Sequence, residues 1–162
     1  AASVRVVQQQ QGACGRGVEI LLCDPFIHRL LQPQRVKLCA VIPKFIKLIQ
    51  QEKEPVIYGD GTQSRDFTYV ENNVWANIQA CTAEKAAGEV FNIACGNRYT
   101  LLDLVRMINE ILGRNVEPKF APERPGDVKH SLADIHKAKE LLGYEVRVSF
   151  REGLEKTIDF FQ

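Results

Sequence analysis

Two arginines in turn-rich segments are the residues of this chain with the clearest chemical potential. Arg65 precedes an aspartate and a phenylalanine, and Arg124 opens the sequence Arg-Pro-Gly-Asp much farther along the chain. A planar guanidinium matches phosphate oxygens two at a time, so two of them in one cleft can bind a diphosphate. Asp127 can accept hydrogen bonds from a ribose diol, and Tyr58, just before a Gly-Asp-Gly turn, can lie against a base. The alternative is that both arginines form surface ion pairs and that Asp127 only shapes a turn.

The elements that must position these residues become regular from Val41 onward. Apolar residues recur there at helical and strand spacings, separated by glycine, proline and capping residues. Helices are predicted over 41–50, 73–82, 100–112, 134–142 and 149–161, and extended segments over 55–58, 66–70, 89–94 and 116–120. Strands separated by helices predict an α/β fold.

Capping residues mark the helix ends. Thr100 is a good N-cap, and Asp103 stands three residues later in the position of a capping-box acid. Two of the predicted helices are followed by a glycine that ends them. One of these glycines is Gly113, after the helix that begins at Thr100. In the helix expected over 73–82, one side carries Val74, Ile78 and Cys81. Cys81 and Cys95 are interpreted as small core residues rather than nucleophiles.

The composition excludes several classes of protein. The 162 residues include 21 Lys and Arg against 20 Asp and Glu, a balance that argues against nucleic acid or an anionic membrane as the main partner. The five cysteines are odd in number and lack C-x-x-C spacing, and the three histidines show no metal-ligand spacing, so no metal site is predicted. A reducing, cytoplasmic location is expected. No apolar run reaches the length of a membrane span, and no secretory signal is recognised.

Residues 41–162 resemble the C-terminal half of the extended short-chain dehydrogenase/reductase family. Within it, the chain is similar to the NAD-dependent nucleotide-sugar epimerases and dehydratases of the UDP-glucose 4-epimerase type. The matching stretches are 41–45, 56–70 with its Ser-Arg-Asp-Phe-Thr-Tyr-Val sequence, 88–94, 124–134 with its Arg-Pro-Gly-Asp sequence, 141–144 and the closing helix around Gly153. The resemblance implies a Rossmann-like, doubly wound sheet, truncated here, with a small C-terminal α/β lobe that binds substrate.

The resemblance also implies roles for particular residues. In a nucleotide-sugar site Arg65 and Arg124 would bind the diphosphate and Asp127 the ribose. Tyr58 would lie beside the base, and the segment from Val41 to Phe45 would wall the nucleotide. Members of the family oxidise a sugar hydroxyl with tightly held NAD and then return the hydride. Their base is the tyrosine of a Tyr-x-x-x-Lys pair.

The chain departs from the family over residues 1–40, which form an atypical N-terminal segment in this interpretation. There is no Tyr-x-x-x-Lys pair ahead of the matching region. The glycines at 12–17 imitate a dinucleotide fingerprint with the wrong spacing and no helix after them. We therefore expect no catalytic or NAD-binding residues in this chain, and no activity of the chain alone. One hypothesis is that residues 1–40 are a family sequence read out of frame or an unrelated fused start, which translation of the other two frames would test.

Three functions remain open at this stage. The chain is part of a UDP-sugar 4-epimerase or 4,6-dehydratase, a non-catalytic module that binds a UDP-sugar, or a structural remnant without a ligand. The strands that begin the family's sheet are missing from the matching region, which leaves the edge next to 89–94 without its normal partner. We therefore expect either self-association or an N-terminal segment that fills the gap.

Overall fold

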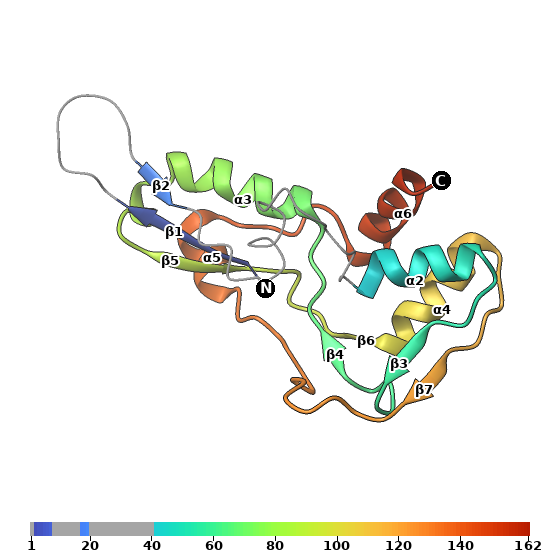
Figure 1. The fold of residues 1–162 in the computed structure, drawn as a ribbon. Helices are drawn as coiled ribbons and strands as arrows, with labels where there is room; N and C mark the ends of the chain where they lie inside the picture. The colour runs from blue at the N-terminus through green and yellow to red at the C-terminus, as the bar shows by residue number, and fades with distance from the viewer. Residues whose placement is uncertain (1, 8–16, 20–40) are drawn as a thin grey trace, which may run out of the picture.

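The computed structural model describes residues 2–7, 17–19 and 41–162 (Figure 1). Its strands are β1 (Ala2–Val7), β2 (Gly17–Glu19), β3 (Val56–Tyr58), β4 (Ser64–Arg65), β5 (Val90–Ile93), β6 (Tyr99–Thr100) and β7 (Lys119–Ala121). Its helices are α2 (Val41–Gln50), α3 (Val70–Thr82), α4 (Leu101–Leu112), α5 (His136–Leu142) and α6 (Phe150–Phe160), with a short 3-10 turn at Glu84–Ala86. Helices are interspersed with strands along 41–162, which confirms the α/β class.

The described strands form three small sheets. β3 and β7 run parallel, with Tyr58 opposite Ala121, and β4 and β6 run antiparallel, with Arg65 opposite Tyr99. The third sheet has the order β2-β1-β5, and both of its pairings are antiparallel. β1 therefore lies along the edge of β5 that the sequence left without a partner, which is the second of the two outcomes expected there.

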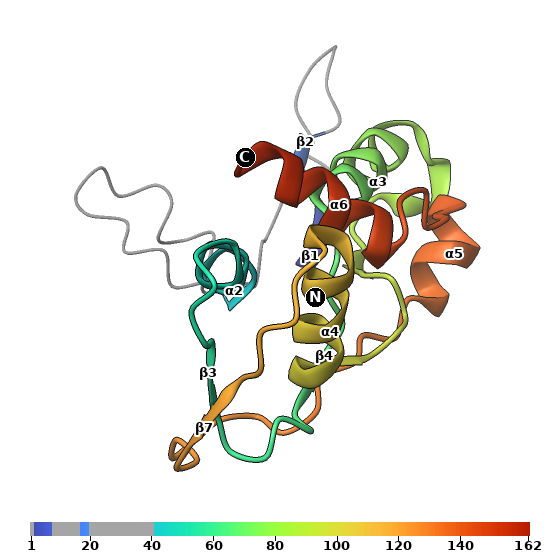
Figure 2. The same cartoon turned by 90° about the vertical axis from the view of Figure 1, so that its right-hand side faces the viewer.

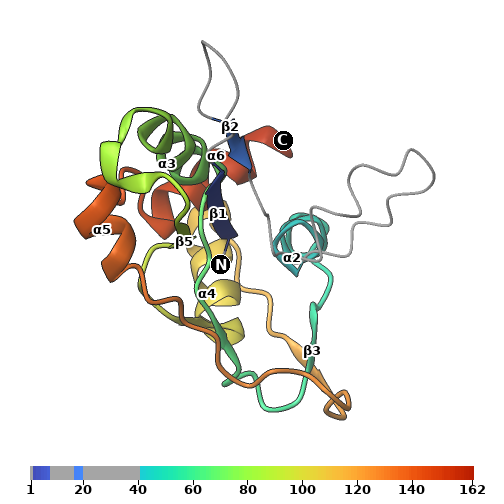
Figure 3. The ribbon, with the colours of Figure 1, turned by 90° about the vertical axis from the view of Figure 1, so that its left-hand side faces the viewer.

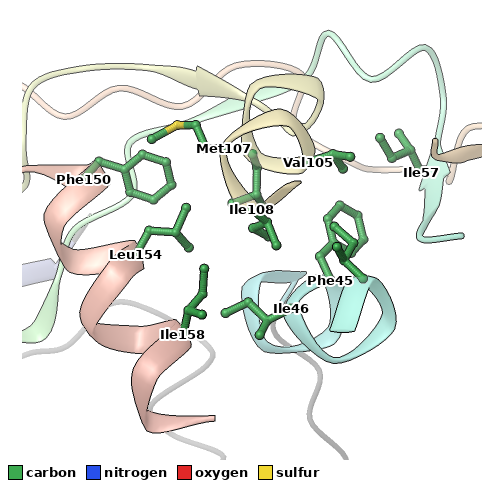
Figure 4. Packing of buried hydrophobic residues seen from close by; sticks show 11 residues of the cluster. Phe45, Ile46, Ile57, Val105, Met107, Ile108, Phe150, Leu154 and Ile158 are labelled. Carbon is green, nitrogen blue, oxygen red and sulfur yellow. The ribbon is translucent and has the colours of Figure 1, made fainter. Parts of the chain in front are cut away.

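Two hydrophobic clusters hold the chain together. The first joins α3, β5 and α5, and the second joins α2, β3, α4 and α6 (Figures 1 and 2). In the second cluster Phe45 and Ile46 of α2 face Ile108 of α4 and Leu154 and Ile158 of α6 (Figure 4). These side chains are almost fully buried, and each such burial contributes about 1.5–3 kcal/mol. The second cluster thus fixes α2 and β3, which carry part of the candidate site.

Two predicted strands are displaced for identifiable reasons. The extended segment expected over 66–70 is β4 at Ser64–Arg65 instead, and α3 already begins at Val70. Asp66 lies beyond this ladder, and its carboxylate accepts the backbone N–H groups of Cys95 and Gly96, at 3.1 and 3.0 Å. The strand expected over 116–120 is found at Lys119–Ala121. The residue before it is a proline, which has no N–H to donate to a ladder.

The interpretation of α3 was wrong about which face is buried. Its buried residues are Asn72, Ala76 and Ala80, whereas Val74 and Ile78 are each 52% exposed and Cys81 is also exposed. Small alanines let α3 approach β5 and α5 closely in the first cluster. The larger apolar residues consequently point away from it. Cys95, by contrast, is buried as expected.

The capping prediction is confirmed at α4. Thr100 accepts the N–H of Asp103 at 3.0 Å, the Asp103 carboxylate accepts the N–H of Thr100 at 3.0 Å, and Gly113 ends α4 with a φ of 62°. Ser149 caps α6 by accepting the N–H of Glu152. At α5 the N-cap is Ile135 rather than Asp134, whose carboxylate accepts the N–H of His136 from one residue farther out.

The capping box gives a pH-dependent prediction. The Thr100 hydroxyl and N–H hold the pKa of Asp103 below its usual 3.8. Because the native pKa is lowered, the carboxylate's contribution is complete above pH 3.8 and is lost as the pH falls through the native value. We expect Asp103→Asn to lower the free energy of unfolding by about 1 kcal/mol at neutral pH, and the difference from the parent to shrink in acid.

Urea unfolding at neutral and acidic pH measures this difference. Asp159→Asn, at an exposed aspartate near the end of α6, is the control and should show no such pH-dependent loss. An Asp103→Asn deficit that stays constant down to the lowest pH would contradict the role given to the carboxylate charge.

Candidate nucleotide-binding site

Tyr58 and Arg124 meet at the carboxyl ends of two parallel strands. Tyr58 is the last residue of β3, and Arg124 follows β7 in the loop 122–131. The carboxyl ends of neighbouring parallel strands lie at one edge of a sheet, and Gly59 N–H donates to the Ala121 carbonyl at 2.8 Å there. The Arg124 guanidinium carbon lies 3.6 Å from the centre of the Tyr58 ring. The predicted base-contacting and diphosphate-binding residues are therefore in direct contact.

This contact changes the acidity of the phenol. The Arg124 guanidinium, through hydrogen bonding and then charge, lowers the pKa of Tyr58 below 10.0, and Lys44 on α2 adds a smaller effect in the same direction. We expect Arg124→Ala to raise the pKa of Tyr58. Near-ultraviolet absorbance of tyrosinate during an alkaline titration measures it, with Tyr58→Phe identifying which transition belongs to Tyr58. An unchanged Tyr58 transition in Arg124→Ala would show that the two side chains do not interact in solution.

A hollow of about 120 Å³ lies beside this pair. It is lined by Tyr58, Gly59, Asp60, Gln63, Glu123, Asp127, Val128 and Lys129. Three of its lining side chains are carboxylates and one is an ammonium, which lies 3.9 Å from Asp60. Carboxylates in this lining can accept hydrogen bonds from hydroxyl groups, but their negative charge disfavours phosphate. A phosphate group would instead be bound by guanidinium groups.

The turn at 124–127 presents Asp127 to this hollow. The Asp127 N–H donates to the Arg124 carbonyl at 3.3 Å, which closes the turn. Gly126 has a φ of 86°, a conformation that residues with a Cβ rarely adopt. The Arg-Pro-Gly-Asp sequence thus encodes a turn that directs Arg124 to Tyr58 and Asp127 to the hollow.

Arg65 contacts the same loop from β4. Its Nη1 donates to the Ser64 carbonyl at 2.8 Å and to the Lys129 carbonyl at 3.4 Å. The loop passes β4 on its way from β7 to α5 (Figures 1 and 3). The structure therefore brings Arg65, Arg124 and Asp127 to one loop, although they are far apart in the sequence.

Val41 and Phe45 do not line this hollow. Phe45 is 2% exposed and packs in the second hydrophobic cluster, and Val41 is half-buried against the same cluster. Their predicted role as a wall of the nucleotide stays a prediction. Lys44, inside the predicted wall segment 41–45, lowers the pKa of Tyr58. Two residues that the sequence reasoning did not assign also lie here: Lys129 lines the hollow, and Gln63 donates to the Tyr58 carbonyl at 2.5 Å.

The described residues of 41–162 contain no dinucleotide fingerprint. Within 41–162 no strand leads through a glycine-rich turn directly into a helix: the Gly-Asp-Gly turn after β3 leads to β4. The glycines at 12–16 lie outside the described residues. Among the described side chains, no group of three or more His, Cys, Asp or Glu can hold a metal ion, and no described helix has the length and apolar character needed to cross a membrane.

Comparison with known proteins places these observations in a family. Residues 29–157 match the family model described as GDP-mannose 4,6 dehydratase. A UDP-glucuronate 4-epimerase from Thermodesulfobacterium geofontis is 34% identical over 118 residues, which are 72% of this chain and 36% of that protein. UDP-glucuronic acid decarboxylase 2 of Arabidopsis thaliana is 31% identical over 75% of this chain and 27% of its own.

Solved structures of UDP-sugar epimerases are also similar to this chain. The UDP-glucose 4-epimerase of Thermotoga maritima with UDP-glucose has 38% identity and a TM-score of 0.69 over 75% of this chain and 39% of that chain. The UDP-glucuronic acid 4-epimerase of Bacillus cereus with UDP-glucuronic acid and NAD has 36% identity and a TM-score of 0.71 over the same shares. The chain thus spans about two fifths of these solved relatives. It belongs to the NAD-dependent nucleotide-sugar epimerase and dehydratase family within the extended short-chain dehydrogenases/reductases.

Proposed function

We propose that this chain binds the nucleoside diphosphate part of a UDP-sugar at the Tyr58–Arg124 edge. The observation that carries the proposal is the Arg124 guanidinium stacked on Tyr58 beside a hollow lined by Asp127, with Arg65 bound to the same loop. A stacked aromatic ring suits a base, carboxylates suit ribose hydroxyls, and guanidinium groups suit a diphosphate. The similar T. maritima epimerase was solved with UDP-glucose, which supports uridine as the base.

The proposal concerns the nucleotide rather than the sugar. The relatives that share this region include both 4-epimerases and decarboxylases of UDP-sugars. What their substrates have in common is UDP, so UDP is the part that this region is proposed to recognise. In a complete enzyme of this lineage, NAD accepts a hydride from the sugar and the region described here orients the nucleotide.

Calorimetric titration with UDP tests the proposal. We expect binding in the parent chain, and weaker binding in Arg124→Ala and Arg65→Ala. Loss of a hydrogen bond from a charged group costs about 1.5–3 kcal/mol, which corresponds to about a 10- to 150-fold rise in Kd. The matched control is Arg114→Ala, which removes an exposed guanidinium paired with Glu52 at 2.7 Å, outside the site.

The alternatives are distinguished by the same titration. An absence of UDP binding in the parent would contradict the proposal and favour a structural remnant. Equal losses in Arg114→Ala and Arg124→Ala would point to a general charge effect instead.

A separate activity assay tests the expected lack of catalysis. The chain matches no Tyr-x-x-x-Lys pair or dinucleotide fingerprint, so purified protein with NAD and UDP-glucose should form no UDP-galactose. Turnover above that of a heat-treated sample would contradict this expectation, while leaving the binding proposal in place.

A further inference from the structure

The loop that carries Arg124 and Asp127 is attached to β4 by a specific set of contacts. Ser64 N–H donates to the Lys129 carbonyl at 2.9 Å, and Ser131 N–H donates to the Ser64 carbonyl at 3.0 Å. Between these bonds, the Ser64 hydroxyl and His130 Nδ1 share a hydrogen bond of 2.9 Å. Residues 129–131 therefore run beside Ser64, and His130 forms an isolated parallel β-bridge with it.

Ser64 is the fixed side of this attachment. It is 5% exposed, whereas residues 122–130 are all exposed. Ser64 immediately precedes Arg65, and Arg65 donates to the Lys129 carbonyl. The other end of the loop is fixed where Ala121 of β7 accepts the Gly59 N–H. The segment between these two anchors contains Arg124, the turn and Asp127.

We propose that Ser64 and His130 are positioning residues for the nucleotide site, and that their hydrogen bond sets the place of the loop relative to Arg65. This inference rests on the proposed function. An exposed loop with a looser attachment to β4 would sample more positions, and fixing it on binding would cost conformational entropy. The Ser64–His130 bond removes part of that cost before the ligand arrives. Neither side chain needs to touch the nucleotide for this effect.

Substitutions at His130 test the inference because the contact uses Nδ1. An asparagine places its amide close to the position of Nδ1, whereas alanine leaves the Ser64 hydroxyl without this partner. We expect His130→Ala to raise the Kd for UDP about 5- to 10-fold, the effect of roughly one hydrogen bond, and His130→Asn to stay within about twofold of the parent. His136→Ala, at the exposed first residue of α5, is the matched control and should leave the Kd unchanged.

A second measurement reports on the attachment itself. Hydrogen exchange of the Ser131 amide should be faster in His130→Ala than in the parent, and close to the parent in His130→Asn. Thermal unfolding of both variants should remain near that of the parent, because His130 is exposed. Rescue by asparagine is a result that a merely bulky or charged surface residue would not give.

The outcomes of the two measurements decide the inference. Weaker UDP binding in His130→Ala with rescue in His130→Asn supports it. Equal binding in parent and His130→Ala overturns it, and so does an equal loss in both variants, which would mean that the imidazole itself contacts the ligand. If the parent binds no UDP, the proposed function fails, and the Ser131 exchange alone decides whether the bond fixes the loop.

Discussion

Replacing Asn72 with leucine is expected to lower the free energy of unfolding by about 3–5 kcal/mol. Asn72 is fully buried in α3, and its amide makes three hydrogen bonds to the backbone of the segment before α6. It donates to the Val148 carbonyl at 2.8 Å and accepts the N–H groups of Arg147 and Val148 at 3.0 Å each. Leucine has the same branched arrangement of four side-chain heavy atoms but leaves these groups unpaired, and each unpaired buried polar group costs about 1–3 kcal/mol.

Urea unfolding measures the loss, and Asn77→Leu in the same helix is the matched control. The Asn77 amide donates to the Asn73 carbonyl at 2.8 Å, a contact within the helix itself. Its substitution should therefore cost about 1 kcal/mol or less. Similar losses in the two variants would contradict a special role for Asn72 in joining α3 to the segment before α6.

Gly153→Ala in α6 is expected to destabilise the protein by about 2 kcal/mol, although alanine is the better helix former. A Cβ at this position would lie 2.6 Å from Tyr69 Cβ and 2.8 Å from Tyr69 Cγ. Tyr69 Cβ is bonded to the backbone, so it cannot swing aside, and overpacking of this kind costs about 1–3 kcal/mol. In open space the same substitution would stabilise a helix by about 1 kcal/mol. Whether Gly153→Ala raises or lowers the free energy of unfolding therefore shows whether Gly153 and Tyr69 are in contact.

The double variant Tyr69→Gly/Gly153→Ala provides the control. Without the Tyr69 Cβ the collision is absent, so the methyl group added by Gly153→Ala should cost less in the Tyr69→Gly background than in the parent. Chemical denaturation of the four proteins measures the coupling. Additive effects, or a stabilising Gly153→Ala in the parent, would show that α6 lies farther from Tyr69 than the structure has it.

Much of the fold follows from local sequence. The capping box of Thr100 and Asp103 and the left-handed Gly113 depend on contacts within a few residues, so α4 is predictable at both ends. The same holds for α2 and α6, whose apolar residues recur at helical spacing and face the second cluster. Local signals failed at α3, where the largest apolar side chains are exposed and a buried asparagine anchors the helix.

The sequence likewise identified some residues of the candidate site and missed others. Residue chemistry and resemblance singled out Tyr58, Arg65, Arg124 and Asp127, because guanidinium groups and a turn aspartate are typical of sites that bind a nucleoside diphosphate. The roles of Lys129, Gln63 and His130 had no such signal. A lysine, a glutamine and a histidine are common surface residues, and their spacing in the sequence does not indicate a shared site.

By itself, then, the sequence determined the α/β class, most helix ends and which side chains are candidates for binding an anion, because these depend on side-chain chemistry and near neighbours. Only the tertiary structure decided that β3 and β7 are parallel partners, that Arg124 covers Tyr58 and that Arg65 and Ser64 hold the loop at 129–131. These contacts join residues more than sixty positions apart. Their formation depends on how the two hydrophobic clusters pack, which no local pattern encodes.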